Sequence, residues 1–310
     1  MLMGEYAVLH GEPCIVTAVS ARMRVTVRRT ETDDLVLHAE DVGLMNFCKP
    51  IQQLGVGNIS KATVFVETSL RNFREAYPFD GGLIVETSSE FPATLGFGSS
   101  SAITVAIIAA LSSLLKVCLT DRQIFDLSYK TVLDVQKKGS GFDVAAAVYG
   151  GTLLFTSGGT VIEPIDVSPF PLIVGYTAIK ADTVTLIDAV GKSEDENPSE
   201  VHSIFEKIGA LVLRGRSAME DADWRTLGTL FNHNQMLLTA LGVSHPKLDT
   251  MMLAACDAGA LGAKLSGAGG GDCMIAVAEA NSMEIVKKAI ASAGGQIIPV
   301  TFSALGVTLH

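Results

Sequence analysis

The sequence predicts a mixed α/β (α+β) protein of two domains. Its 310 residues suffice for two domains of ordinary size, and 48% of the residues are hydrophobic, so a substantial core can form. A domain boundary is indicated near the middle of the chain by two glycines and three prolines, at Gly158, Gly159, Pro164, Pro169 and Pro171. We therefore place the domains at residues 1–165 and 166–310.

The first half alternates between strand and helix patterns. Strands are expected at residues 13–29 as a pair, 35–38, 82–86 and 152–156, and the β-branched alternation is clearest in the first of these. Helices are expected at residues 101–117 and 121–137, and Thr120 is a suitable cap for the second helix. Residues 59–79 carry signals of both a strand and a helix, so we assign neither.

The second half shows the same alternation. Strands are predicted at residues 172–178, 274–278 and 296–302, and helices at residues 200–219, 224–241, 246–259 and 283–293. The segment Asp195–Pro198 is polar and is predicted to be a loop.

Composition and charge exclude two classes of partner. The formal net charge is −10, whereas a nucleic-acid-binding surface must be basic, so we expect no nucleic-acid partner. The stretch 102–119 is apolar, but Ser112, Ser113 and Lys116 interrupt it, which favours a buried core helix over a membrane span. No signal peptide is visible, and we expect no membrane partner.

The cysteine pattern indicates reduced thiols. The five cysteines are scattered and form no C-x-x-C pair, so neither a disulfide framework nor a zinc site is predicted. We expect mostly buried free thiols in a cytoplasmic protein, at Cys14, Cys48, Cys118, Cys256 and Cys273.

A glycine-rich segment directly before a predicted helix is the sharpest functional signal. In Gly96-Phe-Gly-Ser-Ser-Ser101 the glycines allow close backbone approach, and the serines offer hydroxyl groups to a phosphate or to Mg²⁺. The spacing is neither that of a Walker A loop nor that of a Rossmann fingerprint. The alternative is a tight strand–helix turn with a serine cap.

Two further glycine segments and a carboxylate complete the pattern. Gly267–Gly271 could bind an anion or form a plain hairpin loop, and Glu5 and His10 of the first segment could be ordinary turn residues. Asp143 follows a glycine turn, where it could accept the proton of a hydroxyl that attacks a γ-phosphate, or simply cap a helix. Together these features predict an ATP-dependent small-molecule kinase.

The combined motifs resemble the GHMP kinases, the superfamily of galactokinase, homoserine kinase, mevalonate kinase and phosphomevalonate kinase. The resemblance covers nearly the whole chain, and residues 92–100 match the family's P-x-x-x-G-L-G-S-S loop with Phe97 in place of leucine. It implies an N-terminal ribosomal-S5-like, ATP-binding domain and a C-terminal ferredoxin-like domain, with the site between them.

The resemblance also implies roles for single residues. The triphosphate would be bound by Gly96, Gly98, Ser99, Ser100 and Ser101. Asp143 would be the catalytic base, and Ser100 would contact Mg²⁺. The wall of the active site would be formed by Glu5, His10, Gly267, Ala268, Gly269 and Gly270.

Two departures from the family pattern concern charge. The family usually has a lysine upstream of the Gly-Glu pair, and this chain has none there. Mevalonate kinases resemble one another in a Mg²⁺-binding glutamate on the helix before the catalytic aspartate; Val132 aligns with it, and Asp134 is the nearest carboxylate. Asp134 is therefore our candidate for the metal shell.

Within the superfamily the chain resembles the isoprenoid branch. Residues 9–13 and 234–264 are similar to mevalonate kinases, whereas residues 4–8, 139–147 and 271–273 look like phosphomevalonate kinases. We expect ATP, Mg²⁺ and mevalonate as ligands; the alternative substrate is phosphomevalonate, whose phosphate would need a cation such as Lys137, Lys138 or Lys192.

Other readings stay open. An ATP-binding sensor without turnover would explain the two departures. A diphosphomevalonate decarboxylase is a further alternative, but those related enzymes differ from this chain around the catalytic aspartate. A homodimer is open as well.

Overall fold

The computed structural model describes residues 1–92, 95–167 and 170–310. Two compact units are present. The first unit comprises Met1–Ser20, Leu95 with Gly96, and the described part of 151–304; the second comprises 21–92, 97–150 and 305–310. This division differs from the predicted domains at 1–165 and 166–310, whose boundary stays a prediction. Pro169, and Ala93 and Thr94 of the predicted phosphate loop, lie outside the described residues.

The second unit is built on a four-stranded sheet. Its order is β2 (Met23–Thr30), β5 (Gly82–Ser89), β3 (Asp34–Ala39) and β4 (Leu44–Pro50). The β3–β5 pair is parallel and the other pairs are antiparallel. Every second residue of β3 is buried, so this sheet has one face toward a core.

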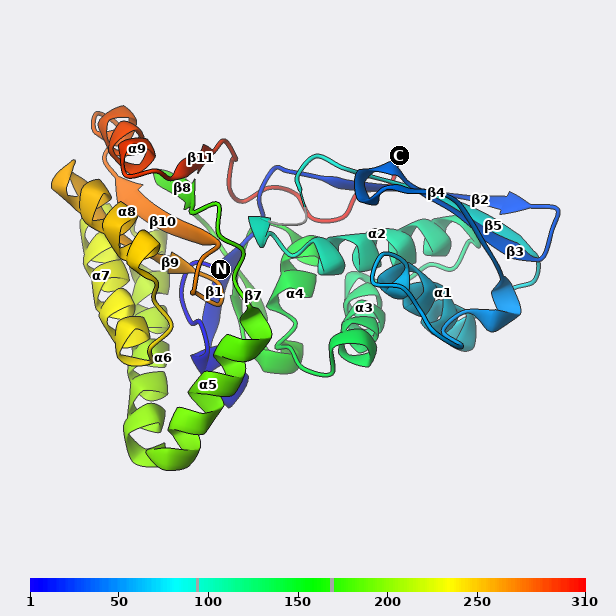
Figure 1. Cartoon of the computed structure of the whole chain (residues 1–310), viewed down its shortest axis with the longest axis horizontal. Helices are drawn as coiled ribbons and strands as arrows, with labels where there is room; N and C mark the ends of the chain where they lie inside the picture. The colour runs from blue at the N-terminus through cyan, green and yellow to red at the C-terminus, as the bar shows by residue number, and fades with distance from the viewer. Residues whose placement is uncertain (93–94, 168–169) are drawn as a thin grey trace. The chain divides into compact units, whose positions relative to one another are not determined.

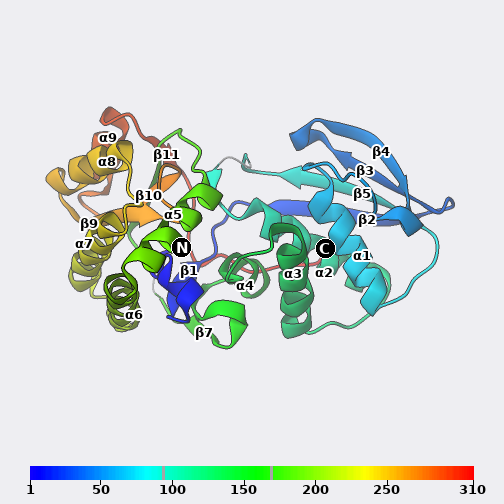
Figure 2. The same cartoon turned by 60° about the horizontal axis from the view of Figure 1, so that its bottom comes forward.

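Helices supply the other side of that core. They are α1 (Val64–Ala76), α2 (Ser99–Leu114), α3 (Asp121–Gln136) and α4 (Phe142–Tyr149), and α1, α2 and α3 lie along one side of the sheet (Figures 1 and 2). Phe73, Ile107 and Phe125 are fully buried among them. Thr120 forms a capping box with Gln123, which confirms the predicted start of α3. Most of the apolar stretch at 102–119 belongs to the core helix α2, as predicted, although this helix ends at Leu114.

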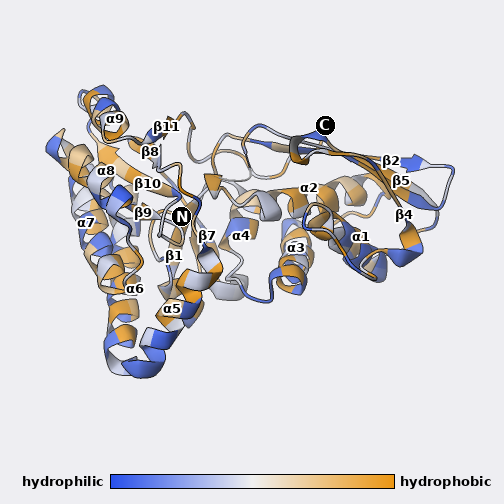
Figure 3. Cartoon of the chain, viewed as in Figure 1, coloured by the Kyte–Doolittle hydropathy of each residue, from blue (hydrophilic) through white to orange (hydrophobic). Residues whose placement is uncertain are grey.

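The first unit contains two sheets. One has the antiparallel order β1 (Cys14–Thr17), β6 (Thr152–Phe155) and β7 (Ile162–Ile165). The other has the antiparallel order β11 (Gln296–Ile298), β8 (Leu172–Tyr176), β10 (Cys273–Ala278) and β9 (Ala260–Ser266). All residues of the central strands β8 and β10 are buried, and β10 is coloured as strongly hydrophobic in Figure 3.

Five helices pack with the second of these sheets. They are α5 (Thr183–Glu196), α6 (Pro198–Glu220), α7 (Trp224–Ala240), α8 (Pro246–Asp257) and α9 (Met283–Ser292). Their buried faces share one hydrophobic cluster with β8, β9 and β10, in which Phe205, Met251 and Met274 lie. Short 3₁₀ helices occur at η1 (Ala7–His10), η2 (Glu40–Val42), η3 (Ile51–Gln53) and η5 (Ser157–Gly159).

Two predictions of local structure are wrong. The strands in residues 13–29 exist but do not pair with each other, because β1 pairs with β6 and β2 with β5. The polar segment Asp195–Pro198 is not a loop: α5 continues to Glu196, and Pro198 occupies the first turn of α6. Proline is well suited to that position, where no intrahelical N–H bond is needed.

Fewer of the thiols are buried than predicted. Cys14 and Cys273 are buried and Cys256 is half-buried, whereas Cys48 and Cys118 are exposed. Among the described residues, no helix is both long and apolar enough to cross a membrane.

A prediction follows from the contact between α7 and β9. A methyl group on Gly228 would lie 2.5 Å from the carbonyl carbon of Leu261. Gly228→Ala should therefore lower the free energy of unfolding by about 3 kcal/mol through overpacking. Gly191 of α5 has open space around it, so the matched change Gly191→Ala should raise that free energy by up to about 1 kcal/mol. Urea unfolding measures both, and equal effects would contradict the proposed packing.

Candidate active site

The start of α2 offers unpaired backbone N–H groups. Gly98 is the N-cap residue, with a φ of 69° that favours glycine, and no side chain caps the helix. The serine-cap alternative is therefore wrong, and the first-turn amides are available to an anion. Ser99 and Ser100 are half-buried, and Ser101 is buried.

Asp143 lies beside this helix start. It stands in the first turn of α4, whose N-cap is Gly141, so Asp143 is not a capping residue. A Cβ atom on Gly98 would lie 3.1 Å from Cγ of Asp143, which means that only glycine leaves this carboxylate its present position. Burial raises the pKa of Asp143 from 3.8 to about 6. The second unit thus brings a candidate base and a candidate phosphate site together.

The sequence around Asp143 is held by Tyr129 of α3. The Tyr129 hydroxyl donates to the Gly139 carbonyl at 2.8 Å, and its ring lies 2.9 Å from where a Cβ of Gly141 would stand. Between these glycines, Ser140 is buried and its Oγ has no hydrogen-bond partner among the described residues. A buried hydroxyl without a partner is uncommon in proteins, and no sequence motif pointed to Ser140.

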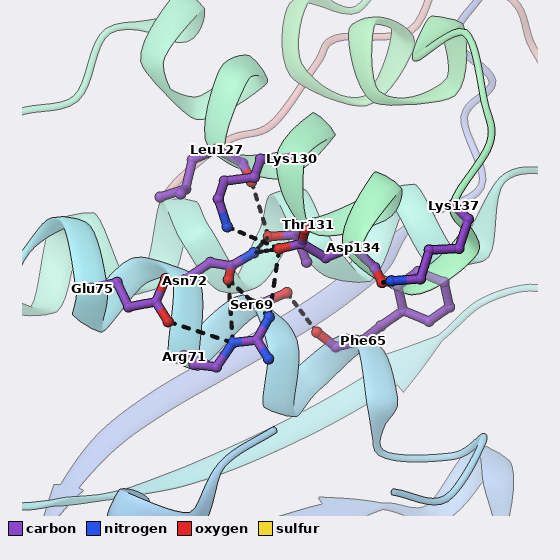
Figure 4. A network of polar contacts seen from close by, with 10 residues as sticks. All are labelled: Phe65, Ser69, Arg71, Asn72, Glu75, Leu127, Lys130, Thr131, Asp134 and Lys137. Carbon is purple, nitrogen blue, oxygen red and sulfur yellow. Dashed lines mark hydrogen bonds and ion pairs between the residues drawn. The ribbon is translucent and has the colours of Figure 1, made fainter. Parts of the chain in front are cut away.

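Asp134 is part of a polar network between α1 and α3 (Figure 4). Its Oδ2 accepts hydrogen bonds from Lys130 Nζ at 2.8 Å and from Asn72 Nδ2 at 2.9 Å, and Arg71 Nη2 lies 3.5 Å away. Burial alone would raise the pKa of Asp134, but these hydrogen bonds and positive charges outweigh it and lower the pKa. Val132, two residues earlier, is 5% exposed and faces the core.

In the first unit, Gly267–Gly271 lies in the connection between β9 and β10. It is thus a hairpin loop, but close contacts fix it. The Tyr6 hydroxyl donates to the Ala268 carbonyl at 2.5 Å, and a Cβ on Gly269 would lie 2.0 Å from the Val243 carbonyl oxygen. Burial raises the pKa of Tyr6 well above its usual range, which keeps this donor protonated.

Glu5 forms a buried ion pair with Lys264 of β9, the strand that leads into this loop. Lys264 Nζ lies 2.5 Å from Glu5 Oε1 and also donates to the Leu265 carbonyl at 2.5 Å. Both side chains are at most 1% exposed, and burial lowers the pKa of Lys264 against the opposing charge of Glu5. Glu5 Oε2 and both amide atoms of Asn234 on α7 are buried without partners among the described residues.

A second lysine contacts the end of the loop. Lys180 Nζ lies 3.2 and 3.1 Å from the two carboxylate oxygens of Asp272, and Oδ1 of Asp272 also accepts a hydrogen bond from the Ala181 N–H. A Cβ on Gly96 would lie 3.0 Å from Asp272 Oδ2. Lys180 is thus a cation close to Gly96, and it could not be predicted from the sequence because no motif includes it.

His10 has a different environment from the other predicted wall residues. Its ring stacks on Phe205 with centroids 4.1 Å apart, and its Nδ1 lies 3.4 Å from Glu194 Oε1. The structure therefore joins Glu5 to the glycine loop, through Lys264 at the end of β9, and joins His10 to α5 and α6.

The buried pair generates a prediction about stability. Glu5→Gln and Lys264→Met should each lower the free energy of unfolding by about 3–5 kcal/mol, because each leaves one uncompensated buried charge. The double variant should lose much less than the sum of the two, since it leaves no net charge in the core. Urea unfolding of the four proteins tests this, and additive losses would show that the two groups do not interact.

Two segments of the chain match family models. Residues 64–151 match the family of GHMP kinases N terminal domains, and residues 216–296 match the GHMP kinases C terminal family. A mevalonate kinase from Thermococcus sibiricus is 33% identical over 100% of this chain and 96% of its own length. One from Pyrococcus horikoshii is 34% identical over 95% of this chain and 90% of its own.

A solved structure agrees with these matches. The L. major mevalonate kinase in complex with R-mevalonate superposes with a TM-score of 0.77 at 26% identity, and the match covers 99% of this chain and 94% of that chain. The two family matches and the full-length relatives lead to one conclusion: the chain belongs to the GHMP kinases.

Proposed function

We propose that this chain is a mevalonate kinase, which transfers the γ-phosphate of ATP to the hydroxyl group of mevalonate. The observation that carries the proposal is the carboxylate of Asp143, packed against Gly98 at the uncapped start of α2. The full-length relatives named as mevalonate kinases support the same substrate.

The proposed reaction needs little covalent chemistry from the protein. The substrate hydroxyl oxygen attacks the γ-phosphorus in line, the bond to the β-phosphate oxygen breaks, and ADP leaves. Asp143 accepts the hydroxyl proton; a base with a pKa of about 6 is mostly ionised at neutral pH and still basic enough to take it. The amides after Gly98, with Gly96 and the hydroxyls of Ser99 to Ser101, are proposed to hold the triphosphate.

Mg²⁺ is part of the proposal, and its two candidate ligands, Ser100 and Asp134, differ in how well they suit the ion. The ion prefers oxygen ligands and keeps several waters beside the substrate phosphates, where it would neutralise charge during transfer. Ser100 fits, because among the described residues its half-buried Oγ has only a long contact of 3.4 Å from Gln136. Asp134 Oδ2 is occupied by Lys130 and Asn72, so the proposal for Asp134 rests on its other oxygen.

The first unit is proposed to contribute the substrate wall. Its proposed members are those of the family resemblance, Glu5, His10, Gly267, Ala268, Gly269 and Gly270. The fixed geometry of the loop supports this role, because Tyr6 and Val243 hold the backbone of Ala268 and Gly269. A homodimer and a cytoplasmic location also belong to the proposal.

Phosphomevalonate is the alternative substrate. Its phosphate would need a free cation, but Lys137 already donates to the Asp134 carbonyl at 2.7 Å. Lys192 is exposed on α5. A base such as Asp143 also serves an alcohol more than it serves an ionised phosphate, which favours mevalonate.

Substrate identity is tested by ADP release with Mg·ATP and, in parallel, mevalonate, phosphomevalonate, homoserine and galactose. We expect strong turnover with mevalonate alone. Turnover with phosphomevalonate alone would replace the proposed substrate. ATP binding without turnover of any of the four would favour the alternative that this chain is an ATP-binding sensor.

Asp143→Asn should abolish phosphate transfer and leave ATP binding intact, because the amide cannot accept the proton. In the unchanged protein, kcat/KM should fall as the pH drops below about 6, where the carboxylate becomes protonated. Asp126→Asn, an exposed carboxylate on α3 paired with Arg122, is the matched control and should change neither property.

The same raised pKa has a consequence for stability. The folded state holds the Asp143 proton more tightly than the unfolded state, so the contribution of this carboxyl is fully favourable below its unfolded pKa and is lost as the pH rises through about 6. Asp143→Asn should therefore gain stability over the unchanged protein at neutral pH, as urea unfolding at pH 5 and pH 7 would show.

For the turnover prediction, unchanged turnover in Asp143→Asn would show that Asp143 is not the base.

A further inference from the structure

Two histidines and a glutamate of the first unit converge on one point. Nε2 of His202 lies 2.7 Å from Oε1 of Glu194, and Nδ1 of His10 lies 3.4 Å from the same oxygen. One ligand atom from each of the three residues lies within 4.8 Å of the others, and no other group of this kind occurs in the described part of the chain.

The three side chains come from three different elements. His10 is the last residue of η1, Glu194 lies in the last turn of α5, and His202 lies near the start of α6. Only Asn197 separates α5 from α6, so that the turn between them brings Glu194 and His202 together (Figure 1). The arrangement depends on the helix α5, which was not predicted from the sequence.

We propose that His10, Glu194 and His202 form a binding site for a divalent transition-metal ion of the zinc class. Two imidazoles and one carboxylate are ligands that Zn²⁺ accepts, whereas Mg²⁺ and Ca²⁺ prefer oxygen ligands throughout. Three protein ligands would leave the fourth tetrahedral position to water. This site is separate in its residues from the proposed Mg²⁺ ligands Ser100 and Asp134.

The distances are close to those that the ion requires. With metal–ligand bonds of about 2.1 Å, the ligand atoms of a tetrahedral site lie about 3.4 Å apart. The His10–Glu194 distance of 3.4 Å already agrees with this. The His202–Glu194 distance of 2.7 Å must lengthen, and the side chain of His202 is 57% exposed and can turn. His10 is held in place by its stacking on Phe205, with an angle of 17° between the rings.

Metal binding at this point would fasten α5. Val190 is the one described residue of α5 that is fully buried, so little apolar surface holds this helix. Its Leu186 packs on the glycine loop, since a Cβ on Gly270 would lie 2.7 Å from Leu186 Cδ1. An ion on Glu194 would therefore restrain a helix that contacts the proposed substrate wall. The restraint on the wall rests on the proposed function, but the metal site itself does not.

The test is a titration of the full chain with Co²⁺, followed by its visible absorption, and then displacement by Zn²⁺. Excess Mg²⁺ is present throughout and ATP is absent, so that oxygen-only sites are occupied. We expect one tight equivalent of Co²⁺ in the unchanged protein and an affinity at least about tenfold lower in His202→Ala. His233→Ala, which removes an exposed histidine of α7, is the matched control and should bind as the unchanged protein does.

Equal binding by His202→Ala and the unchanged protein would overturn the proposal, and so would the absence of micromolar binding. Circular dichroism of His202→Ala checks that the variant folds. Hydrogen exchange of the α5 amides supplies a second readout, which is independent of activity: it should slow several-fold with Zn²⁺ in the unchanged protein and not in His202→Ala. Bound metal without slower exchange would overturn the fastening of α5.

Discussion

The buried pair between Glu5 and Lys264 is the interaction on which the first unit depends. It joins residues at opposite ends of the sequence, and it fixes the N-terminal segment against the end of β9. Such a pair adds little net stability, because removing two charges from water offsets most of their attraction. Breaking the pair is costly all the same, because removing either partner leaves the other as an uncompensated buried charge. The adjoining Tyr6 hydroxyl can then reach the Ala268 carbonyl and define the glycine loop.

A steric constraint has the corresponding role in the second unit. The helix start of α2 and the first turn of α4 approach so closely that a Cβ atom on Gly98 would lie 3.1 Å from Cγ of Asp143. This approach places the Asp143 carboxylate where burial raises its pKa, and it leaves the first amides of α2 without a cap. The glycine thus links the proposed phosphate site and the proposed base through a single contact. A larger residue would have to displace one of the two.

The parts that could be predicted from the sequence are those with a local cause. Thr120 with Gln123 marks the start of α3, and the glycines before Ser99 mark the start of α2, because capping and positive φ act over a few residues. The pairing of β1 with β6 could not be predicted, since the partners lie far apart in the chain. The helix α5 was missed because its sequence is mostly polar, with Val190 alone fully buried. The partners of Asp134 and the position of Lys180 are likewise tertiary and follow no motif.

The Val132 position explains why the polar network of α3 takes its observed form. Val132 faces the core, so a glutamate in the present backbone would carry its charge into apolar surroundings at a high cost in desolvation. Asp134 is displaced by two residues along the helix, about 200° around its axis. Its carboxylate therefore meets Asn72 and Lys130 on another face. Since those donors occupy one of its oxygens, a divalent ion would depend more on Ser100 and on the phosphates of ATP itself than on protein carboxylates. Such a site would bind the ion mainly as a complex with the nucleotide, which is how Mg²⁺ with its reluctance to lose water is commonly held.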